Sequence, residues 1–265
     1  MKLTFLGTGT SCGVPTIGCM CEVCTSTDPH DKRLRCSALL ETETTRLLID
    51  CGPDFRQQIM PMPFRKIDGV LVTHAHYDHM GGMDDLRPYC QFGEINVYAD
   101  PIAKEGLLQM LPYCFAEHRY PGVPAIQLNE IHPHETFQIG DIRIQPFQVM
   151  HGKLPILGFC FNQMADHLPL STLAYITDMK TMDDAEAHFL TTFQPHVDTL
   201  VVNALRQKPH HSHQSLSDAV AFAKQIAARQ TWLVHPSHDI GLHAKVNSVL
   251  PDDIQLAYDG QVVTI

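Results

Sequence analysis

Residues 69–82 of the chain read GVLVTHAHYDHMGG. The segment begins with an apolar run of the kind that forms a buried β-strand, and it ends with two glycines. Between them stand four side chains that can bind a metal ion, His74, His76, Asp78 and His79, all within six residues. Such a density of donors directly after a strand predicts a metal site at the end of that strand.

The spacing of these donors favours two metal ions over one. His74 and His76 are two residues apart and can converge on one ion where the strand bends into a loop. Asp78 and His79 then point elsewhere and can serve a second ion. Imidazole binds Zn, Fe, Ni and Cu, and a carboxylate adds Mn to that range. A polar loop with chance histidines is the alternative, and it fits poorly with the preceding strand.

The composition of the whole chain also points to bound metal. Its 265 residues include 17 His and 9 Cys, while 19 Lys and Arg against 29 Asp and Glu give a formal charge of −10. An acidic chain argues against a general nucleic-acid coat or a binder of anionic membranes, because both need a basic face. We see neither an apolar signal segment nor a run of about 18 apolar residues, so we expect a cytoplasmic protein without a membrane span.

Short apolar runs separated by Gly and Pro predict many β-strands. They lie at 3–6, 37–40, 46–49, 70–73, 96–98, 142–149, 158–161, 173–177, 199–202, 232–235, 255–258 and 262–264. Helical patterns fall between some of them, at 101–111 and most clearly at 216–229, where Ser215 and Asp218 resemble a capping box. Many strands with interspersed helices predict a layered α/β protein.

The string at 74–79 resembles the His-x-His-x-Asp-His signature of the metallo-β-lactamase superfamily. The remaining motif positions match, in order, Asp50, His151, Asp178 and His235, each at the end of an expected strand. The resemblance implies an α/β fold, a four-layer αββα sandwich of two mixed β-sheets flanked by helices. It also implies a single domain over 1–265, with two related halves of about 1–150 and 151–265.

The same resemblance implies the ligand sets of a dinuclear site. One ion takes His74, His76 and His151, the other takes Asp78, His79 and His235, Asp178 lies between them, and Asp50 supports the loop from behind. Two divalent ions that share a water lower its pKa toward neutrality, so a bridging hydroxide is available to attack an ester, amide or phosphodiester. These implications predict a metal-dependent hydrolase, with Asp78 and Asp178 among its catalytic residues.

A second group of donors, Cys19, Cys21 and Cys24, falls within six residues near the N-terminus. Closed zinc sites use four ligands, and a set of three Cys and one His is one common type. The natural fourth ligand is His238, close behind the last predicted ligand of the first site. We therefore predict a structural zinc site in a loop at about 12–36. A redox role for the thiols and unligated buried cysteines are the alternatives.

The opening at 7–15, the cysteine loop, the stretch 50–54 and the C-terminal histidines resemble one branch of the superfamily. That branch holds the phosphoribosyl 1,2-cyclic phosphate phosphodiesterases of the carbon–phosphorus lyase pathway. The resemblance implies that Cys19, Cys21, Cys24 and His238 bind the structural zinc. It also implies a histidine near the scissile phosphate at His213, which stabilises the phosphoryl oxygens or protonates the leaving group. His213 thus joins Asp78 and Asp178 as a predicted catalytic residue.

These features predict a phosphodiesterase for small phosphodiesters, including cyclic ones, with two active-site ions (Zn, Mn or Fe) and one structural zinc. The alternatives are a hydrolase of another ester or thioester, an RNA 3′-processing nuclease, and a non-catalytic metal-stabilised protein of the PQQ-biosynthesis-like branch. A nuclease needs basic charge for its phosphates, and the chain has no Lys/Arg-rich insertion. The expected partner is a small anionic phosphodiester, a membrane is not expected, the charge disfavours nucleic acid, and a homodimer is compatible with the sequence.

Overall fold

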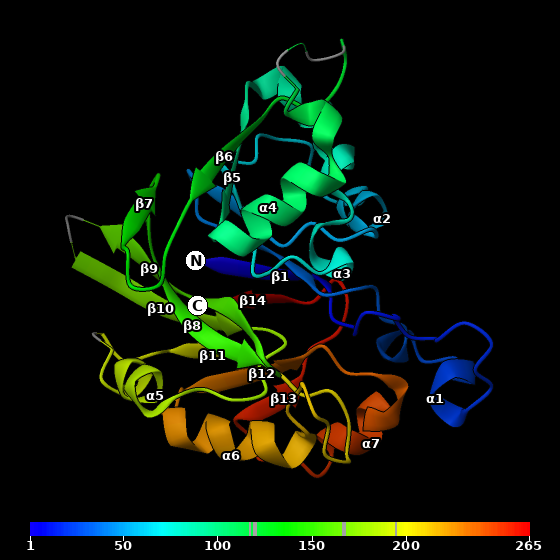
Figure 1. The fold of residues 1–265 in the computed structure, drawn as a ribbon. Helices are drawn as coiled ribbons and strands as arrows, with labels where there is room; N and C mark the ends of the chain where they lie inside the picture. The colour runs from blue at the N-terminus through cyan, green and yellow to red at the C-terminus, as the bar shows by residue number, and fades with distance from the viewer. Residues whose placement is uncertain (117, 119–120, 166–167, 194) are drawn as a thin grey trace.

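Two seven-stranded β-sheets form the centre of the computed structural model, which describes residues 1–116, 118, 121–165, 168–193 and 195–265 (Figure 1). The first sheet has the order β14-β1-β2-β3-β4-β5-β6, from Val262–Thr264, Lys2–Gly7, Ser37–Glu41, Arg46–Ile49, Gly69–Leu71, Ile95–Ala99 and Ile126–Glu130. The second has the order β13-β12-β11-β10-β9-β8-β7, from Ile254–Leu256, Gln230–Val234, Thr199–Asn203, Leu168–Ile176, Leu154–Ala165, Ile142–His151 and Phe137–Ile139. Each sheet mixes parallel and antiparallel pairs, as predicted.

Helices cover the outer faces of both sheets. In the described residues the α-helices are α1 (Glu22–Thr25), α2 (Phe55–Ile59), α3 (Tyr77–Met80), α4 (Pro101–Met110), α5 (Asp184–Thr191), α6 (Leu216–Ile226) and α7 (His243–Asn247). Short 3-10 helices lie at η1 (Pro29–Asp31), η2 (Met83–Phe92), η3 (Pro112–Cys114) and η4 (His238–Ile240). Helices α2 and α4 pack on the first sheet, whereas α5, α6 and α7 pack on the second (Figure 1). The result is the predicted αββα sandwich.

The alternation of side chains along the strands builds these layers. In β10, Leu173 and Tyr175 point into the apolar cluster between the two sheets, whereas Ala174 and Ile176 belong to the cluster beneath the helices. All four side chains are fully buried. Both faces of this part of the strand are covered, which explains why residues 173–176 are continuously apolar instead of alternating with polar residues.

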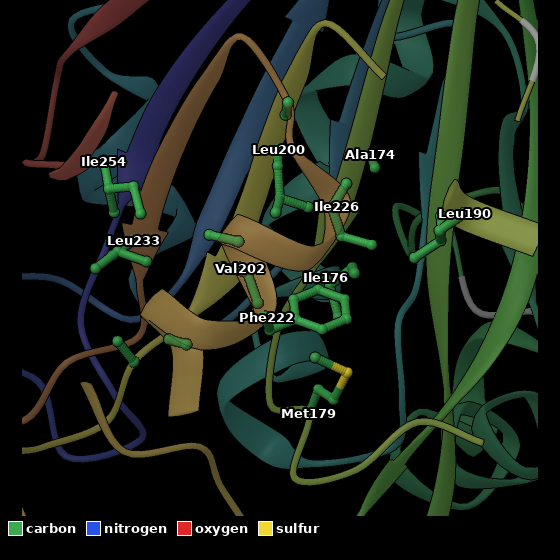
Figure 2. Packing of buried hydrophobic residues seen from close by; sticks show 14 of the residues in the cluster. Ala174, Ile176, Met179, Leu190, Leu200, Val202, Phe222, Ile226, Leu233 and Ile254 are labelled. Carbon is green, nitrogen blue, oxygen red and sulfur yellow. The ribbon is translucent and has the colours of Figure 1, made fainter. Parts of the chain in front are cut away.

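Helix α6 is held by its caps and by its apolar face. Figure 2 shows Phe222 and Ile226 of this helix against the side chains of the second sheet, where each buried side chain contributes roughly 1.5–3 kcal/mol. The predicted capping box is confirmed, because the Ser215 hydroxyl accepts from the Asp218 N–H and the Asp218 carboxylate accepts from the Ser215 N–H. The helix ends before the predicted residue 229, because Ala227 adopts a left-handed φ of 56° and closes it.

Two strands and several short helices escaped the apolar pattern. Strands β6 and β7 lie at sheet edges and are partly exposed, so their sequences lack a continuous apolar run. Helices α1, α2, α3 and α7 have only four or five residues, which is too short for a helical period to show, and the sequence pattern does not predict the eight-residue α5 either. Among the described helices, none has the length and apolar character needed to cross a bilayer.

Both sheets place the ends of strands at one shared edge. Asp50 follows β3, His74 follows β4, His151 ends β8, Asp178 follows β10 and His235 follows β12. Three of them, Asp50, Asp178 and His235, have left-handed φ values of 60°, 60° and 61°, which residues other than glycine rarely adopt. The chain therefore turns sharply at these residues, and backbone strain of this kind clusters at functional sites.

Candidate metal centre

The first donor group consists of His74, His76 and His151, whose ligand atoms lie within 4.8 Å of one another. His74 and His76 leave β4 of the first sheet and His151 ends β8 of the second, so the group joins the two sheets. Nε2 of His74 lies 3.0 Å from Nδ1 of His76. His74 and His151 are buried while His76 is exposed, so the group opens to solvent beside His76.

The second donor group consists of Asp78, His79, Asp178 and His235, all of them buried. Nε2 of His79 lies 3.2 Å from one carboxylate oxygen of Asp178, and Nε2 of His235 lies 3.1 Å from the other. Both Nε2 atoms are buried and make no hydrogen bond, although carboxylates face them. Buried polar atoms are normally satisfied, so this set of nitrogens and carboxylates fits a bound divalent cation.

Asp178 belongs to both sides of the centre. Besides its place in the second group, it forms a further set with His151 and His213, again with ligand atoms within 4.8 Å. Its carboxylate therefore extends from the second group to His151 of the first. The sequence analysis predicts a carboxylate shared by two ions at this residue, and that role stays a prediction.

His213 lies on the loop between β11 and α6, beside both groups. Its ring centroid is 4.4 Å from that of His151 and 5.0 Å from that of His235. Its Nδ1 atom lies 3.7 Å from a carboxylate oxygen of Asp178 and makes no hydrogen bond. The N–H of the next residue, Gln214, donates to the turn after β10 and so fixes the loop. His213 is thereby held where its ring can face a bound substrate.

Cys19, Cys21, Cys24 and His238 also come together, with ligand atoms within 4.8 Å. Sγ of Cys24 lies 3.2 Å from Nδ1 of His238, and the three cysteines are not in disulfides. The backbone N–H of Cys24 hydrogen-bonds Sγ of Cys21 and lowers the pKa of the Cys21 thiol. Burial raises the pKa of Cys24 to about 11. Three thiols and one imidazole are the donors of a closed zinc site, so these four residues could hold that ion.

The comparison with protein families agrees with this geometry. A family model described as "Beta-lactamase superfamily domain" matches residues 45–236. The chain belongs to the metallo-β-lactamase superfamily. The matched range contains every residue of the two donor groups, whereas the cysteine cluster and His238 lie outside it.

Proteins that resemble the chain do so over very different lengths. The crystal structure described as a new diphosphatase from the PhnP family is 36% identical, with a TM-score of 0.87 over 99% of this chain and 96% of that one. An octanoyltransferase of Porphyromonas gingivalis is 41% identical over 98% of this chain but 51% of its own length. Ribonuclease Z of Methanopyrus kandleri is 27% identical over 47% of this chain and 43% of its own. The chain thus spans about half the length of the curated relatives it matches.

Hydrogen bonds behind the superfamily motif aim the histidines at the centre. The buried carboxylate of Asp50 accepts from the Thr73 N–H at 2.8 Å and from Nδ1 of His79 at 2.7 Å. Nδ1 of His151 donates to the carbonyl oxygen of Ser212 at 2.8 Å. In each histidine the bond at Nδ1 leaves Nε2 directed into the centre, as ligating histidines require.

Burial and mutual charge set the protonation of the centre. Burial alone would raise the pKa of Asp178, but His235 and His79 hold that pKa well below its usual range. Burial, with His79 adding to it, lowers the pKa of His74 well below its ordinary value. Burial would lower the pKa of His79 as well, but the neighbouring carboxylates, Asp178 first, raise it well above its ordinary value. At neutral pH Asp178 is therefore ionised and His74 is neutral, which are the forms that bind metal, whereas His79 carries a proton that a bound ion would displace.

Sequence reasoning missed two contributors to the centre. Thr73 is the last residue of the apolar run before the motif, so its sequence position indicates only a strand. Ser212 acts through its backbone carbonyl, which every residue possesses, and no side-chain pattern could reveal it. His210 had no assigned role, and the structure places its ring centroid 5.3 Å from that of His213.

Proposed function

We propose that the chain is a dinuclear metal-dependent phosphodiesterase that hydrolyses small anionic phosphodiesters, including cyclic ones. The observation that carries this proposal is the position of Asp178, whose carboxylate faces the second donor group, His151 of the first group, and His213. Two divalent ions held by these groups, Zn, Mn or Fe, would supply an activated water and positive charge for the phosphoryl oxygens.

In this proposal the role of His213 is to donate from its ring to an oxygen of the substrate. Burial, together with His235, lowers the pKa of His213 to about 3 in the substrate-free chain. A phosphate anion beside the ring favours the protonated form, which can transfer a proton to the leaving oxygen. Its place beside Asp178 and His151 supports this role over that of a solvated loop histidine.

Basic residues in the segments around the centre are compatible with an anionic substrate. The segments 150–153, 178–181 and 206–215 meet there, since the Lys180 N–H donates to the Met150 carbonyl at 2.7 Å and the Gln214 N–H to the Met179 carbonyl at 3.0 Å. They contain Lys153, Lys180, Arg206 and Lys208, of which Lys180 pairs with Asp218 at 3.4 Å. Because Asp78 and Asp178 lie in the centre itself, bound divalent ions would supply most of the positive charge that attracts a small anion.

The relatives support phosphate chemistry and leave one competing activity. The 36% identity with a PhnP-family diphosphatase over nearly the whole of both chains favours a phosphate ester or anhydride as substrate. Octanoyl transfer is the second candidate, favoured by the 41% identity with a protein of that name. That match leaves about half of the relative's length unmatched, and the octanoyltransferase activity can belong to that unmatched half. We also propose a cytoplasmic location, where thiols stay reduced and available to bind zinc.

The test compares two model substrates on the same protein. Chain stripped of metal and reconstituted with Zn or Mn should hydrolyse bis(p-nitrophenyl) phosphate and a 2′,3′-cyclic nucleotide, and the metal-free chain should not. p-Nitrophenyl octanoate reports the competing acyl chemistry. No phosphodiester turnover with two bound ions confirmed by metal analysis would overturn the proposal, and turnover of the octanoate alone would favour the second candidate.

A further inference from the structure

Thr73 stands between a buried carboxylate and a histidine of the first donor group. Its side chain has no exposure to solvent. Its Oγ1 lies 2.9 Å and 3.1 Å from the two carboxylate oxygens of Asp50, and 3.0 Å from Nδ1 of His74. The hydroxyl therefore touches both partners at hydrogen-bond distance.

The single proton of the hydroxyl decides how these contacts are arranged. The Asp50 carboxylate already accepts from the Thr73 N–H and from Nδ1 of His79, so it acts as an acceptor on both oxygens. If Thr73 gave its proton to His74, the oxygen lone pairs would face those carboxylate oxygens with no proton between them. The proton thus points to Asp50, and Oγ1 accepts from Nδ1 of His74. That leaves Nε2 of His74 unprotonated and directed into the centre.

We propose that Thr73 is a positioning residue that orients His74 on behalf of Asp50. One buried carboxylate then orients a donor in each group: His79 directly, through Nδ1, and His74 through the Thr73 hydroxyl. The inference rests on the metal centre of the proposed function, but it concerns metal binding and ring tautomer, which are measured without any hydrolysis.

The arrangement has a definite consequence for the two ions. Removing the hydroxyl frees the ring of His74 to carry its proton on Nε2, where the proton competes with the ion of the first group. The bond between Asp50 and His79 stays in place, so the second group keeps its orientation. Loss of the hydroxyl should therefore weaken the binding of the ion in the first group and leave the binding of the other ion nearly unchanged.

The test uses isosteric variants and a matched control. Thr73→Val removes the hydroxyl at constant shape, and Thr73→Ser keeps it. Thr4→Val is the control, because Thr4 of β1 is also a buried threonine but its hydroxyl has no hydrogen-bond partner. Chelator competition with Mn²⁺ should show one of two affinities weakened about 10- to 100-fold in Thr73→Val, as for other groups that orient ligands. Thr73→Ser and Thr4→Val should match the unmodified chain.

Three results would overturn the inference. The first is a folded Thr73→Val that binds both ions as tightly as the unmodified chain, and the second is a Thr73→Ser that loses as much affinity as Thr73→Val. The third needs no threonine variant: ¹⁵N–¹H spectra of the metal-free chain should place the His74 ring proton on Nδ1, with the signal assigned by its absence from His74→Ala. A proton on Nε2 would refute the arrangement even if Thr73→Val failed to fold. If the metal affinities and the ring proton are as expected but the chain hydrolyses no phosphodiester, the proposed function fails and the inference about Thr73 stands.

Discussion

Replacing Asp178 by asparagine removes one negative charge from the centre while preserving its shape. The backbone at Asp178 has a φ of 60°, a left-handed conformation that asparagine adopts more readily than most residues. Alanine would add backbone strain at this position, so Asp178→Asn is the cleaner perturbation. The Thr177 hydroxyl, which donates to the carboxylate at 2.6 Å, keeps an amide oxygen as its acceptor.

The size of the effect follows from the distances around the carboxylate. Its oxygens lie 3.2 Å and 3.1 Å from the two unpartnered Nε2 atoms of His79 and His235. A unit charge about 4 Å from another contributes about 4 kcal/mol at an effective dielectric of about 20. Loss of the charge should therefore weaken metal binding by a factor of at least about 10³. At a metal concentration about 1,000 times the original Kd, the metal would then stabilise the folded variant by about 4 kcal/mol less than the unmodified chain.

The assay measures metal content after dialysis, together with thermal unfolding with and without Mn²⁺. Asp84→Asn serves as the control, because Asp84 belongs to neither donor group and pairs with Arg87 at the surface, and such pairs contribute about 1 kcal/mol or less. We expect Asp178→Asn to retain at most one of the two active-site ions and to lose most of the Mn²⁺-dependent rise in Tm. A variant that binds two ions with unchanged affinity would refute the reasoning about the shared carboxylate.

Three further outcomes are expected. Cys21→Ser should lower the zinc content by about one equivalent and reduce Tm, and an unchanged zinc content would contradict the four-donor site. His213→Ala should lower kcat for phosphodiesters about 10²-fold or more with metal content unchanged, whereas intact kinetics would remove its catalytic role. Burial and Arg33 lower the pKa of His243 to about 4 in the fold. Between this pKa and the ordinary value of about 6.5, the unfolded chain binds a proton at His243 that the folded chain does not. The free energy of unfolding is therefore full above about pH 6.5 and falls by up to about 3 kcal/mol toward pH 4. Urea unfolding of His243→Gln should not show this loss.

The layered fold was predictable because its signals are local. A strand such as β10 is buried on both faces, so the apolar run is visible without knowledge of its neighbours. The capping box at Ser215 is equally local, since three residues suffice to show it. Edge strands β6 and β7 are partly exposed and depend on a single neighbour, and their sequences carry no such run.

The candidate site was predictable where metal-binding side chains stand at the ends of recognisable strands. The structure brings together the predicted donors of both groups and the three cysteines with His238. The sequence did not indicate the backbone turns and hydrogen bonds that orient these donors. The left-handed turn at Asp50 and the carbonyl of Ser212 are backbone properties, and the role of Thr73 depends on an aspartate 23 residues away. Such features arise only once the strands are packed.

His235 and His238 lie in different donor clusters, and only Pro236 and Ser237 separate them. Ser237 is fixed at both its N–H and its hydroxyl by the carbonyl of Leu205. One inserted or deleted residue would displace one imidazole by about 3.8 Å, far beyond the roughly 0.2 Å tolerance of a metal–ligand bond. The fixed spacing links the two clusters in evolution. A related chain that keeps both clusters must keep the length of the segment 235–238, whereas one without the cysteines can vary it.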